Sequence, residues 1–196
     1  MNVILRAVLA YVLILPPVLL AQKDQAGHEY SFVGTKGCKK CHLKQFKSWK
    51  TTNMAKAFDI LKAGERAEAK KQAGLDPAKD YTQDTECLPC HTTGYGKSGG
   101  FVSLEETPQL AGVSCEMCHG AGSEYVKEQY MHLKNKNYKR SEVVKVGLNS
   151  PVTGKSCTEV CHNEKSPFFN KDEPFDFEKR KDDGTHKHYP LKYKHD

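Results

Sequence analysis

Four stretches of the sequence place two cysteines close together and a histidine directly after the second one. Three have two residues between the cysteines, and the last has three. Two thiols at this spacing form thioether bonds with one porphyrin, and the histidine gives its iron an axial nitrogen. The sequence therefore predicts four covalently bound haem c groups. The attachment residues are Cys38, Cys41, Cys87, Cys90, Cys115, Cys118, Cys157 and Cys161, and the iron ligands that follow them are His42, His91, His119 and His162.

The alternative for this many cysteines is a zinc protein. Cys87/Cys90 and Cys115/Cys118 have the spacing of a zinc ribbon. A ribbon does not need a histidine after each cysteine pair, yet all four pairs have one although the chain has only nine histidines. The four motifs use all eight cysteines, so none is left for a disulfide. The pattern favours haem over zinc and over a disulfide scaffold.

The fourth motif, Cys157–His162, differs from the others by its extra residue. We expect this residue to loop out so that the histidine can return beneath the iron.

The first 21 residues carry one early charge, Arg6, and then an unbroken apolar run from Ala7 to Ala21. This pattern is typical of a cleaved signal peptide. An uncleaved membrane anchor is the alternative, but the run is shorter than the roughly 20 residues that a spanning helix needs. We expect a signal peptide at 1–21, one tetrahaem domain at 22–196, and location in the periplasm or another extracytoplasmic compartment. Membrane attachment is expected only if the segment is retained.

The formal net charge of +6 does not indicate nucleic-acid binding. A ferric haem with two ionised propionates carries about −1, so four of them bring roughly −4 and leave the oxidised holoprotein nearly neutral. The secondary-structure pattern is mainly α with long loops, and the four close-packed haems are expected to form much of the core. The sequence predicts helices at 43–61, at 65–74 and from Ser123 to about Lys139, and a short hairpin near Phe101–Leu104.

Several stretches resemble the tetrahaem cytochrome c-554 family, the electron acceptors of hydroxylamine oxidoreductase. They are Ser48–Lys50, Leu75–Asp84 (LDPAKDYTQD), Gly112–Glu116 and His186–Tyr189. The resemblance implies a mostly helical fold with haems in close-packed pairs. It also implies two axial histidines on three irons and an open iron in the second haem. The residues Thr92–Gly100 that follow His91 contain no histidine or methionine.

The same resemblance implies the remaining iron ligands. His132 matches the second ligand of the first haem, with Met131 as its competitor, and His186 matches that of the fourth, with His188 as its rival. Met54 stands where the family has a histidine that faces the third haem. A thioether there would keep that iron six-coordinate, although a methionine on a helix is often only a packing residue. His28 and His195 are expected to contact solvent or propionates.

The expected function is electron relay and not catalysis. The electrons would come from a redox protein such as hydroxylamine oxidoreductase and pass to a downstream cytochrome or a membrane quinone-linked acceptor. Reduction of nitric oxide or a related nitrogen species at an open second haem is the alternative, because an open iron binds small ligands. A subunit of a haem-lined extracellular filament, or of a fixed redox complex, is a second alternative. Turnover of nitric oxide separates the enzyme from the carrier, and sedimentation separates the filament.

Overall fold

A computed structural model describes residues 29–191, 193 and 195 of the chain. The predicted signal peptide and His28 lie outside these residues. No helix within the described part has the length and apolar character needed to cross a membrane.

Short helices joined by long loops make up the described chain, and its β-structure is limited to isolated bridges such as Thr92 with Ala111. This confirms the predicted mainly α fold class. The helices are α1 (Thr35–Cys41), α2 (Leu43–Trp49), η1 (Asp59–Leu61), α3 (Ala67–Gln72), α4 (Leu88–His91), η2 (Pro108–Leu110), α5 (Cys115–His119), α6 (Arg140–Lys145), α7 (Gly154–Thr158) and α8 (Phe177–Gly184).

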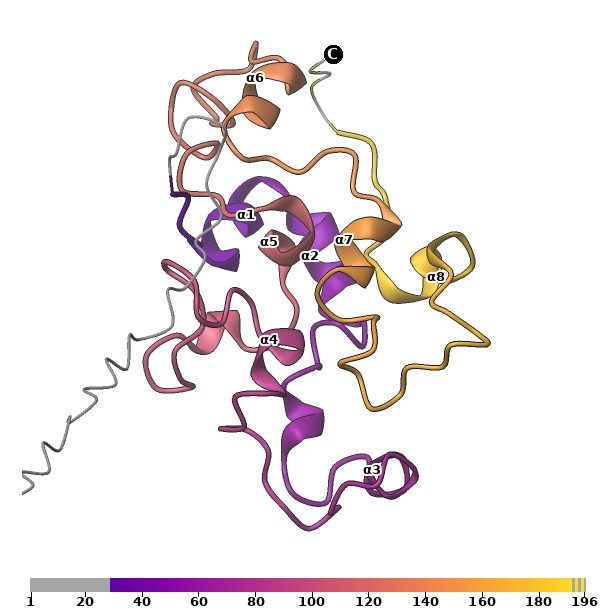
Figure 1. The fold of residues 1–196 in the computed structure, drawn as a ribbon. Helices are drawn as coiled ribbons and strands as arrows, with labels where there is room; N and C mark the ends of the chain where they lie inside the picture. The colour runs from indigo at the N-terminus through magenta and orange to yellow at the C-terminus, as the bar shows by residue number, and fades with distance from the viewer. Residues whose placement is uncertain (1–28, 192, 194, 196) are drawn as a thin grey trace, which may run out of the picture.

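The middle of the molecule holds α1, α2 and α5, with α6 and α3 toward opposite ends (Figure 1). Helix α1 contacts α2, α5 and η2, and α7 contacts α8. The chain after α8 runs past α7 toward α6 (Figure 1), where the Arg140 N–H donates to the His195 carbonyl at 2.6 Å. The end of the chain therefore lies beside the start of α6.

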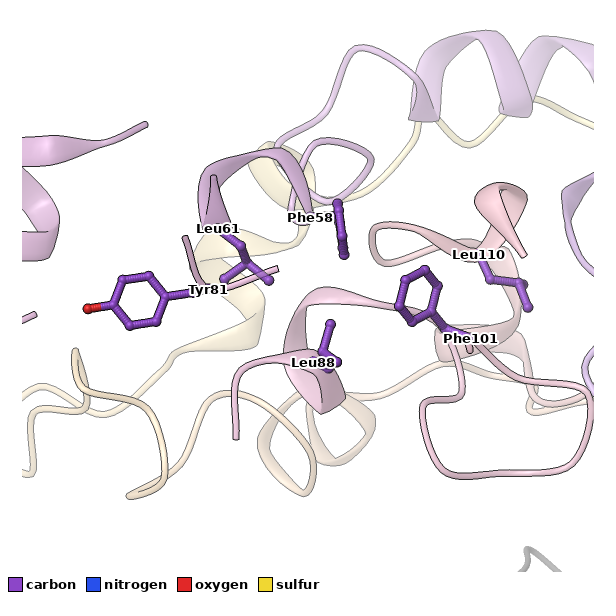
Figure 2. Packing of buried hydrophobic residues seen from close by; sticks show 6 residues of the cluster. All are labelled: Phe58, Leu61, Tyr81, Leu88, Phe101 and Leu110. Atoms are coloured by element: carbon purple, nitrogen blue, oxygen red, sulfur yellow. The ribbon is translucent and has the colours of Figure 1, made fainter. Parts of the chain in front are cut away.

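One cluster of buried apolar side chains lies where η1 and α4 approach each other (Figure 2). The rings of Phe58 and Phe101 pack at 5.4 Å between centroids, and Leu110 is 1% exposed. The members are Phe58, Leu61, Tyr81, Leu88, Phe101 and Leu110. The cluster fixes the position of α4, which carries the second haem motif.

The helix predicted at 43–61 is wrong beyond its first third, because α2 ends at Trp49. The Thr51 and Thr52 hydroxyls each donate to the carbonyl three residues earlier at 2.7 Å. Such bonds compete with the helical ladder, and the chain continues in turns to η1.

The other helix predictions have mixed outcomes. Helix α3 confirms the prediction at 65–74, with its ends two residues inside the expected ones. The helix predicted from Ser123 is wrong: the chain there forms turns, and the Met131 N–H donates to the Tyr125 carbonyl. No hairpin forms at Phe101–Leu104; the Phe101 N–H instead donates to the Thr93 carbonyl. Helices α6 and α8 were not predicted.

Candidate functional site

Each cysteine–histidine motif lies at a short helical turn, so both thiols of a motif share one side of the chain. In the first two motifs the histidine N–H closes the turn on the carbonyl of the first cysteine. The distances are 2.9 Å for His42 to Cys38 and 3.2 Å for His91 to Cys87. A turn of this size brings two thiols and an imidazole toward one bound group.

The fourth motif makes the same closure in a wider turn. The Cys157 carbonyl accepts from the Cys161 N–H at 3.2 Å and also from the His162 N–H at 3.0 Å. The second bond spans five residues instead of four, which is the geometry of a π-type turn. The extra residue is therefore taken up by widening the turn, and the histidine still directly follows the second thiol.

The four motif histidines have the protonation state that a metal ligand needs. Burial lowers the pKa of His42, His91 and His162, and it lowers that of His119 to about 4. A neutral imidazole keeps a lone pair for a metal.

His91 is also oriented for ligation by a backbone group. Its Nδ1 lies 2.6 Å from the Ala57 carbonyl oxygen, which accepts the ring proton. Nε2 is then left without a proton and free to bind a metal.

The first and third motifs are neighbours. Helices α1 and α5, which carry them, contact each other, and the Cys38 and Cys115 thiols are close enough that each shifts the pKa of the other. The Glu116 carboxylate, only 2% exposed, accepts from the backbone N–H groups of Val33, Gly34 and Gly122. Helix α5 is thus joined to the segment that leads into α1.

The second and fourth motifs form another neighbouring pair. The Cys90 thiol donates to the Val160 carbonyl at 3.5 Å, and the Cys161 sulfur lies 4.0 Å from the Cys90 carbonyl oxygen. These two contacts cross about 70 residues of sequence. The chain thus groups its attachment sites in two pairs.

Asn149 connects the two pairs. Its backbone N–H donates to the His119 carbonyl at 2.8 Å, and its side-chain amide donates to the Cys118 carbonyl and to Ser156 Oγ at 2.8 and 2.9 Å. Thr93 makes a second connection: its buried hydroxyl donates to Gly112 and accepts from the Ser114 N–H. The four motifs therefore belong to one hydrogen-bonded assembly.

The resemblance implies three further iron ligands, His132, His186 and Met54, and the structure places them in different surroundings. The His186 ring lies 6.2 Å from that of His119 between centroids. Nδ1 of His132 accepts from the Lys134 N–H at 3.2 Å, so ligation through its Nε2 would require that bond to be given up. The methyl of Met54 lies 3.7 Å from the point where a Cβ on Gly184 would stand. The structure thus brings Met54 and His186 to one region but keeps His132 in a separate turn.

His195, expected to contact solvent or a propionate and not to bind iron, also packs on protein. Its ring stacks on Tyr138 at 3.8 Å, and its Nδ1 lies 3.0 Å from the Tyr138 carbonyl oxygen. No pattern in the sequence indicates this contact, because the two residues are 57 positions apart.

The thiol pairs, the neutral imidazoles and the shared turn geometry fit covalently attached haem at all four motifs. Together with the helical fold they define a multihaem c-type cytochrome. Residues 37–120 match the family described as cytochrome c554 and c-prime. The structure also matches the reduced state of cytochrome c554 from Nitrosomonas europaea with a TM-score of 0.73 and 34% identity, over 85% of this chain and 89% of that one. The chain belongs to the cytochrome c554 family, whose members carry four haem c groups.

A curated relative gives a closer but shorter match. Cytochrome c-554 of Nitrosomonas europaea (strain ATCC 19718 / CIP 103999 / KCTC 2705 / NBRC 14298) is 50% identical over 94 residues. This match covers 48% of the chain but only 40% of the relative, well under half of the relative's length. The family assignment confirms the resemblance and the predicted cofactor.

Proposed function

We propose that this chain is an extracytoplasmic electron carrier that relays electrons between redox proteins. The observation that supports this most directly is the placement of the four attachment motifs in two contacting pairs joined through Asn149. Haem iron supplies reversible one-electron reduction when bound. The chain's own part is to hold neighbouring sites against each other, as the Glu116 carboxylate does when it joins α5 to the segment before α1.

The partner surface we propose lies over α1 and α2. Six lysines there are exposed: Lys36, Lys39, Lys40, Lys44, Lys47 and Lys50. Two of them, Lys39 and Lys40, stand between the cysteines of the first motif, so a partner held by this lysine patch would lie beside that haem. Positive charge of this density favours an acidic partner. A hydroxylamine-oxidoreductase-like donor fits this role, with a downstream cytochrome or a membrane quinone-linked protein as acceptor.

The ligand roles follow the motifs. His42, His91, His119 and His162 each bind one iron from the side of their own motif, and His132 is proposed by resemblance to complete the first iron. The second iron is proposed to keep an open position. Met54 and His186 remain as candidates for the other irons.

The direct test is electron transfer by the purified, haem-loaded protein. Reduced hydroxylamine oxidoreductase should reduce it rapidly, and it should then pass electrons to an oxidised small cytochrome. The control is the same mixture without the carrier. A protein that turns over nitric oxide but leaves the acceptor oxidised would instead be a reductase, and one that sediments only as large assemblies would be a structural subunit.

A further inference from the structure

The His119 and His186 rings lie close together although the two residues are far apart in the chain. Their centroids are 6.2 Å apart, and their planes differ by 25°. His119 ends the third haem motif on α5, whereas His186 lies two residues beyond the end of α8. We propose that these two histidines are the two axial ligands of the third haem.

The separation of the rings is the first argument. A bond between a metal and an imidazole nitrogen is about 2.0 Å long, and the ring centre lies about 1 Å further out. Two imidazoles on opposite sides of one iron therefore have centroids about 6 Å apart. Direct ring stacking would bring the centroids closer, as in the 3.8 Å of Tyr138 and His195. The 6.2 Å of this pair matches the separation of two imidazoles that bind one iron from opposite sides.

The hydrogen bonding of His186 is the second argument. Its Nδ1 lies 3.0 Å from the Lys187 carbonyl oxygen, which accepts the ring proton. Nε2 is thereby left free for a metal, as it is in His91, where the Ala57 carbonyl has the same role. A backbone carbonyl behind the ring is the usual way in which a protein orients a ligating histidine.

Helix α2 holds the segment that carries His186. The Lys187 N–H donates to Ser48 Oγ at 2.9 Å, and Gln45 donates to the Tyr189 carbonyl at 3.5 Å. The Lys44 ammonium also lies over the Tyr189 ring at 6.0 Å. These contacts fix the residues on the C-terminal side of His186, and α8 fixes those on the N-terminal side. The ring is thus positioned from both directions.

Met54 explains why the chain needs this arrangement. Its methyl group lies 3.7 Å from where a Cβ on Gly184 would stand, so it packs beneath the end of α8 just before His186. The Met54 thioether, which packs against this segment, and the His186 imidazole, which belongs to it, therefore lie in the same region. The proposal differs from the arrangement implied by resemblance, in which Met54 completes the third iron and His186 the fourth. Here His186 takes the place of the missing histidine at position 54, and Met54 supports the segment.

The proposal rests on the haem attachment, but its test does not depend on electron transfer. Low-temperature electron paramagnetic resonance of the oxidised protein counts low-spin and high-spin irons. His188 is exposed, and its ring centroid lies 5.1 Å from that of His186. It could therefore replace His186 as a ligand, so the variant that lacks only His188 is the control. His188→Ala should leave the spectrum unchanged. His186→Ala/His188→Ala should convert one low-spin iron to high spin without loss of haem mass.

A relocated histidine identifies which iron is affected. Met54→His in the double variant should restore the lost low-spin signal, because position 54 adjoins the segment that carried His186. An unchanged spin count in the double variant would overturn the proposal. If the double variant loses a low-spin signal and Met54→His does not restore it, His186 binds another iron. That result would also overturn the proposal. An iron–methionine absorbance band near 695 nm in the unmodified protein, absent from Met54→Ala, would do the same. None of these results bears on whether the protein carries electrons between partners.

Discussion

The Glu116 carboxylate accepts a hydrogen bond from the Gly34 N–H at 2.7 Å. This bond connects the interior of the third haem motif with the residue that precedes α1, which carries the first motif. The same carboxylate accepts from Val33 and Gly122, so one buried side chain satisfies three backbone donors. Gly34 has a φ of 79°, a left-handed conformation that directs the chain toward the carboxylate and that glycine adopts without strain.

Glu116→Gln should therefore destabilise the holoprotein. The amide would place an N–H₂ group among three N–H donors, and charge-assisted hydrogen bonds would be lost. We expect a loss of about 2–4 kcal/mol in the free energy of unfolding, measured by denaturant titration of the oxidised protein. Glu128→Gln is the control, because Glu128 pairs with Lys134 on the exposed surface and such pairs contribute about 1 kcal/mol or less. Equal stability of the two variants would contradict this role for Glu116.

The sequence alone was sufficient to predict the haem c groups that the family carries, because a motif of two closely spaced cysteines and a histidine is local. It also predicted a helical chain with long loops. It could not predict contacts that join distant segments, such as Glu116 with Gly34 or His119 with His186. The failed helix from Ser123 has the same origin: its polar and aromatic residues suit a helix, but Ser123 is bonded to a distant segment. Its N–H donates to the Ser31 carbonyl at 3.1 Å, and its hydroxyl accepts from the Ser31 N–H at 2.9 Å.

The wider turn of the fourth motif should hold a haem as the other three do. The intact mass of the mature protein should correspond to four haems, and that of Cys157→Ser/Cys161→Ser to three. His162 closes the turn on the Cys157 carbonyl at 3.0 Å, which keeps it beside both thiols. If the intact mass of the unmodified protein corresponds to only three haems, no haem is attached at the widened turn of the fourth motif.

The second haem should be high-spin in the oxidised protein. His91 is held as its ligand by the Ala57 carbonyl at 2.6 Å, and Thr92–Gly100 contain no histidine or methionine to bind the other side. A high-spin signal should be present in the electron paramagnetic resonance spectrum and should shift to low spin when cyanide is added. A spectrum with only low-spin iron before addition would mean that a residue from elsewhere in the chain completes this iron.

The lysine patch of α1 and α2 should control how fast a redox partner reduces the protein. In Lys39→Glu/Lys40→Glu, two positive charges beside the first attachment site become negative. We expect the second-order rate of reduction by an acidic donor to fall about tenfold or more at low ionic strength, and the difference to shrink as salt is added. The matched control is Lys62→Glu/Lys71→Glu, which makes the same change in net charge on exposed lysines at the α3 end of the molecule. Stopped-flow kinetics with both variants separates a local patch from an effect of total charge. If both variants slow reduction equally, the donor responds only to net charge and does not dock beside the first haem.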